Sequence, residues 1–547
     1  MFTGEPVPVT SHWQLFVDDY VVGRSTGLDR VVHHPKAKGV VIAADRPWET
    51  AGAAPVHIHR DKDGTFQAFY NAMWWNPSEG SDHAAFKVDR AHHISAAVAL
   101  ATSADGVRWE KPSLRLVEGP AEVDRSAAPF PQPKGSTREN NLGVPFNFVA
   151  DLGQWGNVAD PARRYALRLA PKADAGFRIG SNWDLAPKGY FAAAIPDFRN
   201  DPRWMDKLVD SGSQFNPRRK MLHFWDDVHR EWVTIEQGVV GHWLPTREIA
   251  RFGSKDLQSW TAEACLYPDA ADPHRQDRYD EPMHMTPLHT EGVVLGLLAW
   301  FHSDRTHPEG GPILRDPAQP GGHPDHWPFC RKGFGGTRIT ISRDGGKTWD
   351  RTSSREDWIP HGTEQDSYDR IAWCGPTPVR VGDEDWFYAT CISGDHLGIR
   401  ANREQSSYYR HRLQTQQVGL YVQKRNRYVS LTARNFVEVL ISKPVTLEGE
   451  TLEVNADASR GRIRVGIGSA EPMSLFDGRA AGAAPHLLSS RGLIEGFGFD
   501  DCVPIEADGI EQKVAFKGGR RIAELRGRPV YLLFEMVDAD LYGFRTV

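Results

Sequence analysis

A short turn motif, repeated along the chain, restricts the folds that are open to this sequence. Its complete form is SRDGGKTW, in which Ser342, Asp344, Gly346 and Trp349 occupy the four defining positions of an Asp-box. The serine and aspartate side chains of such a turn hydrogen-bond to nearby backbone and hold the hairpin together. In propeller blades this turn joins the third strand to the fourth, and its tryptophan fills the gap between neighbouring blades.

Reduced versions of the turn recur at a nearly constant interval. They begin at Ser103 (SADGVRW) and Ser254 (SKDLQSW), and SNWDL at Ser181 has the pattern of a further, decayed copy. Successive serines up to Ser342 are 78, 73 and 88 residues apart, and one more step ends near residue 420, in VGLYVQKRNRYVSL. That last segment has the pattern of two outer strands. The repeat therefore predicts a β-propeller of five blades.

The segments between these turns have the pattern of strands rather than helices. In most of them apolar and polar residues alternate, β-branched and aromatic residues are frequent, and Asp-Gly, Gly-Gly and Asp-Asp pairs interrupt them. The 51 glycines and 37 prolines also favour turns and short strands over long helices. The pattern is clearest in six segments, 56–75, 94–109, 218–235, 291–301, 337–349 and 383–394.

The C-terminal part of the chain has a different pattern. After about residue 435 the strands at 441–467 and 528–544 alternate without any blade turn, which suits a β-sandwich. We therefore expect an all-β protein in which residues 1–434 form the five-bladed propeller, with N-terminal strands in 1–40 closing or covering it. Residues 435–547 should form the accessory sandwich.

Composition excludes several classes of function. A net charge of -6 and a pI near 6.4 give no electrostatic reason to bind nucleic acid or an anionic membrane. No apolar run approaches the roughly 20 residues that span a bilayer. The N-terminus lacks the pattern of a secretory signal. The five cysteines are dispersed and never form a CxxC pair, which argues against a disulfide framework and fits a reducing compartment. We therefore expect a cytoplasmic protein. The 18 tryptophans suit stacking on sugar rings, although large β-proteins also bury tryptophan in their cores.

Several segments together resemble those of known carbohydrate-active proteins. They are LFVDDYVV near the N-terminus, PWE at 47–49, the repeated turns, GDEDWFYATCISGDH, and the closing IEGFGFDDCVPIEADG with RGRPVYLLFEMVDADLYGF. In these segments the chain resembles five-bladed propeller glycoside hydrolases related to the fructosidase/invertase and arabinanase-type families. The resemblance implies the same fold with a C-terminal sandwich and activity on a carbohydrate. The first predicted blade lacks a WMNDPNG motif, the second lacks a clear Arg-Asp-Pro and the third lacks Glu-Cys, so fructan specificity does not carry over.

Acidic and amide residues stand where the innermost strand of each predicted blade should begin. Such strand starts surround the central funnel of a propeller, so their side chains converge on one pocket. Glycoside hydrolysis uses two carboxyl groups, one as general acid and the other as base or nucleophile. The expected strand starts lie near Glu49, at 139–141, near Asp210, at Asp280 with Glu281, and at 364–369.

Glu281 is the residue that we expect to act as general acid. It precedes Pro282, which favours extended backbone at a strand start. The neighbouring charge of Asp280 and the apolar side chains of Met283 and Met285 should both favour a protonated carboxyl group at this position.

The remaining site residues follow from position and from the resemblance. Related propeller enzymes keep their nucleophile or base in the first blade, which implies that role for Glu49. Asp210 and Asp366 should modulate the pKa values of this pair or hold substrate hydroxyls. We expect substrate binding from Trp48, Asn140, Asn141, His242, Arg247, Asp280 and Asp369.

Neither a metal nor a cofactor is expected. His57 and His59 share one face of a predicted strand, but no third ligand stands at a matching spacing. The predicted function is hydrolysis of a glycosidic bond in a small oligosaccharide or glycoside. The alternatives are a non-catalytic carbohydrate-binding propeller and another sugar-active propeller enzyme, a lyase or a sialidase. The sequence leaves the oligomeric state open.

Overall fold

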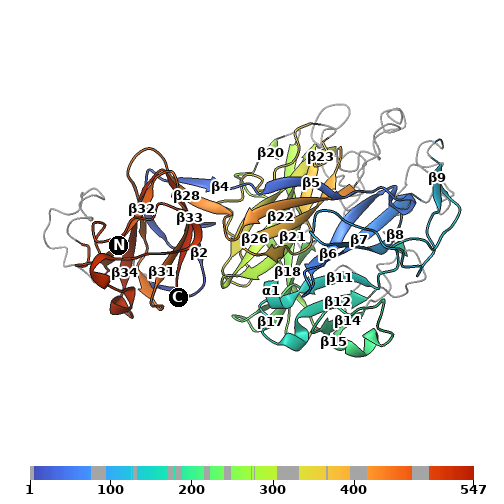
Figure 1. Cartoon of the computed structure of the whole chain (residues 1–547), viewed down its shortest axis with the longest axis horizontal. Coiled ribbons are helices and arrows are strands. Elements are labelled where there is room, and N and C mark those ends of the chain that lie inside the picture. The colour runs from blue at the N-terminus through green and yellow to red at the C-terminus, as the bar shows by residue number, and fades with distance from the viewer. Residues whose placement is uncertain are drawn as a thin grey trace, which may run out of the picture. The chain divides into compact units, whose positions relative to one another are not determined.

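Nearly all of the regular secondary structure that the protein shows is β-strand (Figure 1). The computed structural model describes residues 5–547 except 76–93, 125, 127–131, 170–176, 179–187, 215–221, 239–247, 273, 276–277, 305–331, 365–366, 395–415 and 471–491. The helical segments of this described part are single turns: α1 (Leu152–Trp155), η1 (Pro47–Glu49), η4 (Pro161–Arg163), η6 (Trp204–Lys207), η10 (Lys517–Gly519) and η11 (Ile522–Leu525). No helix in it has the length and apolar character of a membrane span.

Two compact units make up the chain. Unit 1 comprises Met1–His34, Asp350–Glu356 and Gln423–Val547, and unit 2 comprises Pro35–Trp349 and Asp357–Val422. Most of the predicted site residues belong to unit 2.

The strands of unit 2 form five antiparallel groups along the chain, and each group is called a sheet below. Two of them are separate four-stranded sheets, whereas single parallel residue pairs join the other three into one continuous 13-stranded sheet. The first consists of β6 (Gly52–Arg60), β7 (Phe66–Trp75) and β8 (Ile94–Ser103). The second consists of β11 (Phe146–Asp151), β12 (Tyr165–Leu169), β14 (Lys188–Ala192) and β15 (Val209–Gln214). The third consists of β16 (Phe224–Asp226), β17 (Glu231–Gly238), β18 (Glu248–Ser254) and β19 (Thr261–Leu266). The fourth consists of β21 (Arg278–Thr290), β22 (Val293–Asp304) and β23 (Lys332–Ser342).

The fifth sheet closes the series with a strand from near the N-terminus. It consists of β24 (Ile371–Cys374), β25 (Val379–Val381), β26 (Glu384–Ile392), β27 (Gln416–Lys424) and β5 (Lys36–Ile42). Strand β5 pairs antiparallel with β27. Single residue pairs link this sheet to its neighbours, Gln416 with Gly52 of the first sheet and Ile371 with Gly335 of the fourth. Four further short strands lie beside these sheets: β9 (Glu122–Asp124), β10 (Gln132–Lys134), β13 (Phe177–Arg178) and β20 (His274–Arg275).

In a β-propeller, antiparallel sheets follow one another along the chain, and the last sheet includes a strand from near the N-terminus. Unit 2 has this connectivity. The predicted fold class is confirmed, and we interpret each sheet as one blade. Strands β7, β8 and β22 are buried along nearly their whole length. Because a blade is covered on both faces by its neighbours, such strands read as continuous apolar runs rather than alternating ones.

The repeated turns follow the third strand of their sheets. Asp344, after β23, accepts hydrogen bonds from the backbone N–H groups of Lys347 and Thr348 (3.1 and 2.9 Å), and the Trp349 indole donates to the Gly346 carbonyl (3.0 Å). The turns after β8 and β18 have the same contacts, centred on Asp105 with Trp109 and on Asp256 with Trp260. The segment that begins at Ser181 lies outside the described residues.

Unit 1 contains two six-stranded sheets. One consists of β1 (Val7–Val9), β30 (Val445–Leu447), β34 (Val530–Val537), β29 (Glu438–Ser442), β3 (Val22–Thr26) and β32 (Arg462–Ser469). The other consists of β33 (Asp508–Lys513), β31 (Leu452–Asp457), β35 (Ala539–Thr546), β28 (Val429–Ala433), β4 (Asp29–Val32) and β2 (Gln14–Leu15). Side chains of both sheets share one apolar core, which includes Val465 and Phe534 from one and Val454 and Leu541 from the other. This is the arrangement of a β-sandwich.

The unit boundaries differ from the expected division at residue 434. Strands β1 to β4 pair with β30, β35, β29 and β28, so the N-terminal strands up to residue 32 complete the sheets of unit 1. Only β5 joins the last propeller sheet. Of the two outer strands expected near residue 420, β27 belongs to that sheet and β28 to the sandwich.

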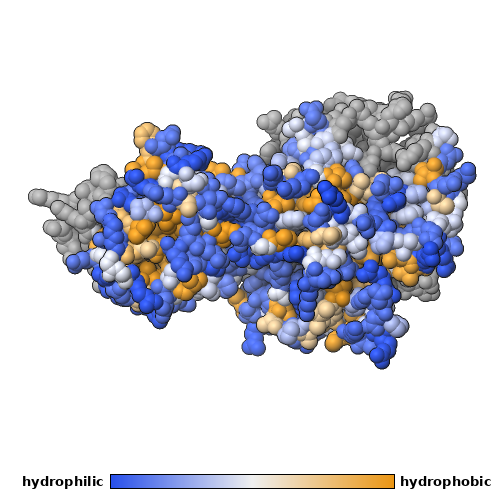
Figure 2. Space-filling view, viewed as in Figure 1, coloured by the Kyte–Doolittle hydropathy of each residue, from blue (hydrophilic) through white to orange (hydrophobic). Residues whose placement is uncertain are grey.

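Polar side chains cover most of the molecular face drawn in Figure 2. Among the described residues, the large apolar side chains that are strongly exposed include Val228 and the adjacent Phe436 and Val437. Scattered apolar residues of this kind are normal for a protein surface.

Candidate functional site

Glu49 ends η1, three residues before the first residue of β6, and is completely buried. Its Oε1 accepts a hydrogen bond from the Tyr70 hydroxyl (2.7 Å). Its Oε2 accepts from Lys111 Nζ (2.7 Å) and from the backbone N–H groups of Asp45 and Arg46 (3.0 Å each). Burial, with the nearby charge of Glu49, raises the pKa of Tyr70 well above its usual value, so the phenol keeps the proton that it donates. Both oxygens of Glu49 are therefore anchored inside the protein.

The amide and indole groups predicted beside Glu49 are also engaged within the protein. Trp48 Nε1 donates to Asn141 Oδ1 (2.9 Å), and Asn141 Nδ2 donates to the Tyr70 hydroxyl (2.6 Å). Asn140 Nδ2 donates to the carbonyls of Val117 and Thr137 (3.0 and 2.8 Å). All three predicted residues are buried. These contacts stabilise the entry to the first sheet, and a role in substrate binding stays a prediction.

Asp280 and Glu281 stand at the beginning of β21, the first strand of the fourth sheet, and both are completely buried. Adjacent residues of a strand project to opposite faces of the sheet. Asp280 is opposite His302, and its Oδ2 lies 2.9 Å from His302 Nδ1. Glu281 is opposite Phe301, which belongs to an apolar cluster with Ile371 and Trp373.

The two methionines expected near Glu281 separate in the structure. Met283 packs against the cluster that contains Phe301, whereas Met285 belongs to a different cluster with Trp300 and Trp349. An apolar wall of methionines beside Glu281 stays a prediction.

A group of charged and imidazole side chains surrounds Asp280 on its face of the sheet. We call it the β21 site and define it as Asp280, His302, Arg338, Asp357 and His361. His302 Nε2 lies 3.5 Å from Asp357 Oδ2, and His361 Nδ1 lies 3.0 Å from the same oxygen. Arg338 Nε donates to Asp357 Oδ1 (3.1 Å), and its guanidinium lies 4.4 Å from the Trp300 ring.

Burial decreases across the β21 site towards His361. The exposed fraction of the side chain is 1% for Asp280, 7% for His302, 8% for Asp357 and 24% for His361. Burial lowers the pKa of His302, but its hydrogen bonds to Asp280 and Asp357 outweigh this effect and raise that pKa overall. Burial would likewise raise the pKa of Asp357, but His302, His361 and Arg338 hold it far below its usual range.

The other predicted residues do not join this site in the described structure. Asp210 lies on β15, the fourth strand of the second sheet, where it is exposed and accepts a hydrogen bond from the Gly212 N–H (2.8 Å). It was expected at the start of an innermost strand, a position that it does not have. Asp369 lies two residues before β24 and accepts a hydrogen bond from the Ser367 hydroxyl. Asp366, His242 and Arg247 lie outside the described residues.

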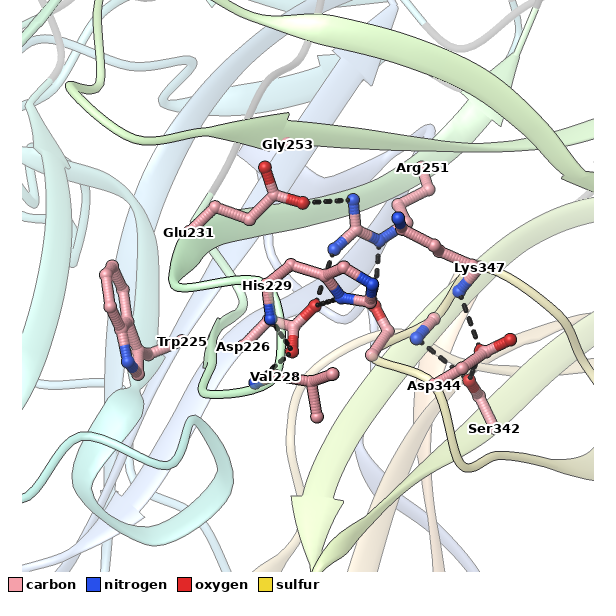
Figure 3. Close-up of polar contacts among 12 residues, drawn as sticks. Trp225, Asp226, Val228, His229, Glu231, Arg251, Gly253, Ser342, Asp344 and Lys347 are labelled. Atoms are coloured by element: carbon pink, nitrogen blue, oxygen red, sulfur yellow. Dashed lines mark hydrogen bonds and ion pairs between the residues drawn. The ribbon is translucent and has the colours of Figure 1, made fainter.

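Two groups in the described part of the chain have the composition of a metal site, and the sequence analysis found neither. One is His302, Asp357 and His361. The other is Asp226, His229 and Glu231, but there the Arg251 guanidinium already supplies the cation, donating to Asp226 Oδ2 and Glu231 Oε1 (2.8 Å each; Figure 3).

The histidine pair noted in the sequence belongs to neither group. His57 and His59 stack with their ring centroids 5.4 Å apart, and neither ring nitrogen of His57 has a hydrogen-bond partner among the residues that the structure describes. Burial, with the nearby His59, lowers the pKa of His57 well below its usual value, so the ring is neutral.

Signals for the β21 site exist in the sequence, but they are weak. His302 directly follows an uninterrupted apolar run, VVLGLLAWF, and Asp357 and His361 are four residues apart. A polar residue that ends a buried strand needs a partner. The sequence does not say which partner it has.

Comparisons with known proteins give the following results. Neither a protein-family model nor a curated protein matches this sequence. Among solved structures, the chain is similar to a glycosyl hydrolase from Bacteroides ovatus, with 11% identity and a TM-score of 0.36 over 76% of this chain and 98% of that one. It is also similar to a β-1,2-mannobiose phosphorylase from Listeria innocua, with 10% identity and a TM-score of 0.38 over 70% of this chain and 94% of that one. At these values the likeness establishes no family for the chain.

Proposed function

We propose that the protein is a glycosidase that acts on a small oligosaccharide or glycoside. The observation that carries the proposal is the pair of adjacent, fully buried carboxyl groups, Asp280 and Glu281, at the first strand of the fourth sheet. Innermost strand starts surround the pocket of a propeller. One face of this strand start leads through the β21 site to the partly exposed His361, which supports a polar pocket at this end of the sheet.

Glu281 is the proposed general acid. Its cross-strand neighbour Phe301 belongs to an apolar cluster, and burial of a carboxyl group favours the protonated form. An acid in that form can donate a proton to the leaving oxygen of a glycoside.

Glu49 remains the proposed base or nucleophile, as implied by the resemblance to propeller glycosidases. Both of its oxygens accept hydrogen bonds from protein donors, so this role requires that substrate displaces at least one of them. Replacing Glu49 by Gln distinguishes the roles: loss of turnover at unchanged stability supports catalysis, and lower stability with retained turnover supports anchoring alone.

The test of Glu281 compares leaving groups. A panel of 4-nitrophenyl glycosides first identifies a sugar that is hydrolysed, and the methyl glycoside of the same sugar then supplies the poor leaving group. Glu281→Gln should lower turnover of the methyl glycoside at least ~100-fold, the lower range for losing general acid catalysis. Turnover of the 4-nitrophenyl glycoside, which needs little protonation, should fall much less.

The matched control is Glu118→Gln, because the Glu118 side chain is 65% exposed in a long ion pair with Arg138 (3.8 Å). It should leave both activities unchanged. If Glu281→Gln lowers both activities equally, or neither, then Glu281 is not the acid. If the wild-type protein binds sugars but hydrolyses none of the panel, the non-catalytic carbohydrate-binding alternative gains support.

A further inference from the structure

We propose that His302, Asp357 and His361 bind one divalent transition-metal ion, and that Asp280 orients the His302 ring for this purpose. The three ligand atoms are His302 Nε2, Asp357 Oδ2 and His361 Nδ1, and all lie within 4.8 Å of one another. The proposal concerns ion binding and does not depend on the sugar chemistry proposed for Glu281.

The spacing of these atoms suits a metal ion. Asp357 Oδ2 lies 3.5 Å from His302 Nε2 and 3.0 Å from His361 Nδ1. Ligand atoms at 2.0–2.2 Å from a tetrahedral zinc ion are about 3.4 Å apart. The ion therefore fits with only small movements of these side chains.

The partners of each ligand direct the correct atom towards the site. An ionised Asp280 can only accept, so His302 donates through Nδ1 and turns Nε2 towards Asp357. Metal-binding histidines almost always donate their second ring N–H in this way, often to a carboxylate. Arg338 donates to Asp357 Oδ1, and Oδ2 is the oxygen that faces the two rings. Binding of the ion uses the Nε2 lone pair and so displaces any proton on that atom.

Charge at the site favours a divalent ion. The guanidinium of Arg338 lies 3.1 Å from Asp357, 3.7 Å from Asp272 and 3.9 Å from Asp280, and the three carboxylates are buried. Carboxylates within and beside the ligand set attract a divalent cation, and Arg338 offsets part of their charge.

The ligand set indicates the class of metal. Two imidazoles and one carboxylate suit zinc, iron(II), nickel or copper better than calcium or magnesium, which prefer oxygen ligands. His361 is the most exposed ligand, with 24% of its side chain accessible. It leaves room for water or another ligand to complete the coordination.

The Asp226, His229 and Glu231 group provides an internal contrast. Its two carboxylates share the Arg251 guanidinium, which lies between them (Figure 3). Arg338 instead approaches the β21 site through Asp357 Oδ1 and leaves the Oδ2 side to the imidazoles. We therefore expect metal binding at the β21 site only.

The test uses the full-length protein after chelator treatment and removal of the chelator. Titration with Co²⁺ should give visible absorption bands that saturate at one ion per chain, and Zn²⁺ should abolish them by displacement. His361→Ala should weaken Co²⁺ binding at least about 100-fold. Asp280→Ala should weaken it about 10- to 100-fold, the usual effect of removing the partner of a ligating histidine. His229→Ala is the matched control and should bind Co²⁺ as the wild type does.

Each outcome decides the proposal. The absence of saturable Co²⁺ binding overturns it, and so does unchanged binding by folded His361→Ala, whose fold is checked by circular dichroism. Intense near-ultraviolet bands that indicate cobalt–thiolate bonds would move the site to a cysteine and would also overturn it. Failure here leaves the leaving-group test of Glu281 unaffected, because binding is measured without any sugar.

Discussion

Arg251 connects two neighbouring sheets of unit 2, and its removal gives the sharpest stability prediction. This residue of β18 is 2% exposed, and it donates hydrogen bonds to Asp226, to Glu231 and to the carbonyl of Gly345 (2.8 Å each). Asp226 and Glu231 flank the hairpin of the third sheet, whereas Gly345 belongs to the turn after β23 of the fourth (Figure 3). One guanidinium thus holds a hairpin of one sheet against a turn of the next.

The expected cost of Arg251→Met follows from what each partner loses. Methionine retains much of the aliphatic volume, but Asp226, also 2% exposed, loses the guanidinium beside its carboxylate. Removing one member of a buried ion pair costs about 3–5 kcal/mol. The unmatched Gly345 carbonyl acts in the same direction, and the more exposed Glu231 can be hydrated and adds little. We expect a loss of about 3–5 kcal/mol in the free energy of unfolding.

Urea unfolding followed by tryptophan fluorescence measures this loss. Because Trp13 is the only tryptophan of unit 1, the fluorescence signal comes mainly from unit 2, which contains Arg251. The control is Arg138→Met, since Arg138 is 63% exposed and 3.8 Å from Glu118. It should change stability by no more than about 0.5 kcal/mol. Adding Asp226→Asn to Arg251→Met should restore part of the loss, because the stranded charge is removed. A loss below about 1 kcal/mol for Arg251→Met, or an equal loss for Arg138→Met, would refute the reasoning.

Three further predictions concern single side chains. Asp344→Ala should lower stability by about 1–3 kcal/mol because it strands two backbone N–H groups of the turn; in thermal melts an unchanged midpoint, together with lost glycosidase turnover, would contradict this structural role. Tyr70→Phe should cost about 1–3 kcal/mol in urea unfolding, since it removes the buried donor to Glu49, and an unchanged urea midpoint would contradict it. Burial lowers the pKa of His223 to about 3. Between pH 7 and pH 5 the unfolded chain therefore binds a proton at this histidine, whereas the folded chain does not. This difference should lower the free energy of unfolding by about 2 kcal/mol as the pH falls from 7 to 5. The urea midpoint should therefore fall less between pH 7 and pH 5 in His223→Gln than in the wild type. The glutamine amide oxygen can still accept a hydrogen bond from the Ile235 N–H. An equal fall in the two proteins would contradict the lowered pKa of His223.

The sequence predicts most where a local interaction determines the structure. The turn after β23 depends on side chains within eight consecutive residues, so SRDGGKTW specifies its own hydrogen bonds. The interval between such turns then indicates the size of each sheet. The turn motif and its spacing were therefore enough to predict an all-β propeller.

Strand pairing across long distances lacks such a local signal. Strand β1 pairs with β30, more than 400 residues later, and alternation within β1 says nothing about which partner completes its sheet. The same difficulty explains Asp210. The region 186–215 is rich in glycine, proline and aspartate and gave no clear strand pattern, so β14 and β15 were not anticipated. Asp210 was consequently assigned to the start of the third sheet instead of the outer edge of the second.

The β21 site shows how far a rule based on strand starts can reach. That rule selects Asp280, because an acid before an apolar strand stands out locally. It does not select His302 or Arg338, which lie on the two strands beyond, within runs of buried residues. Yet burial of a charged or imidazole group is costly unless a partner of complementary chemistry is also buried. Charged residues on buried strands of one antiparallel sheet should therefore be considered together. The register places His302 opposite Asp280. The need to compensate these buried groups then points to partners such as Asp357 and His361, and so to the candidate metal site, without any sequence motif.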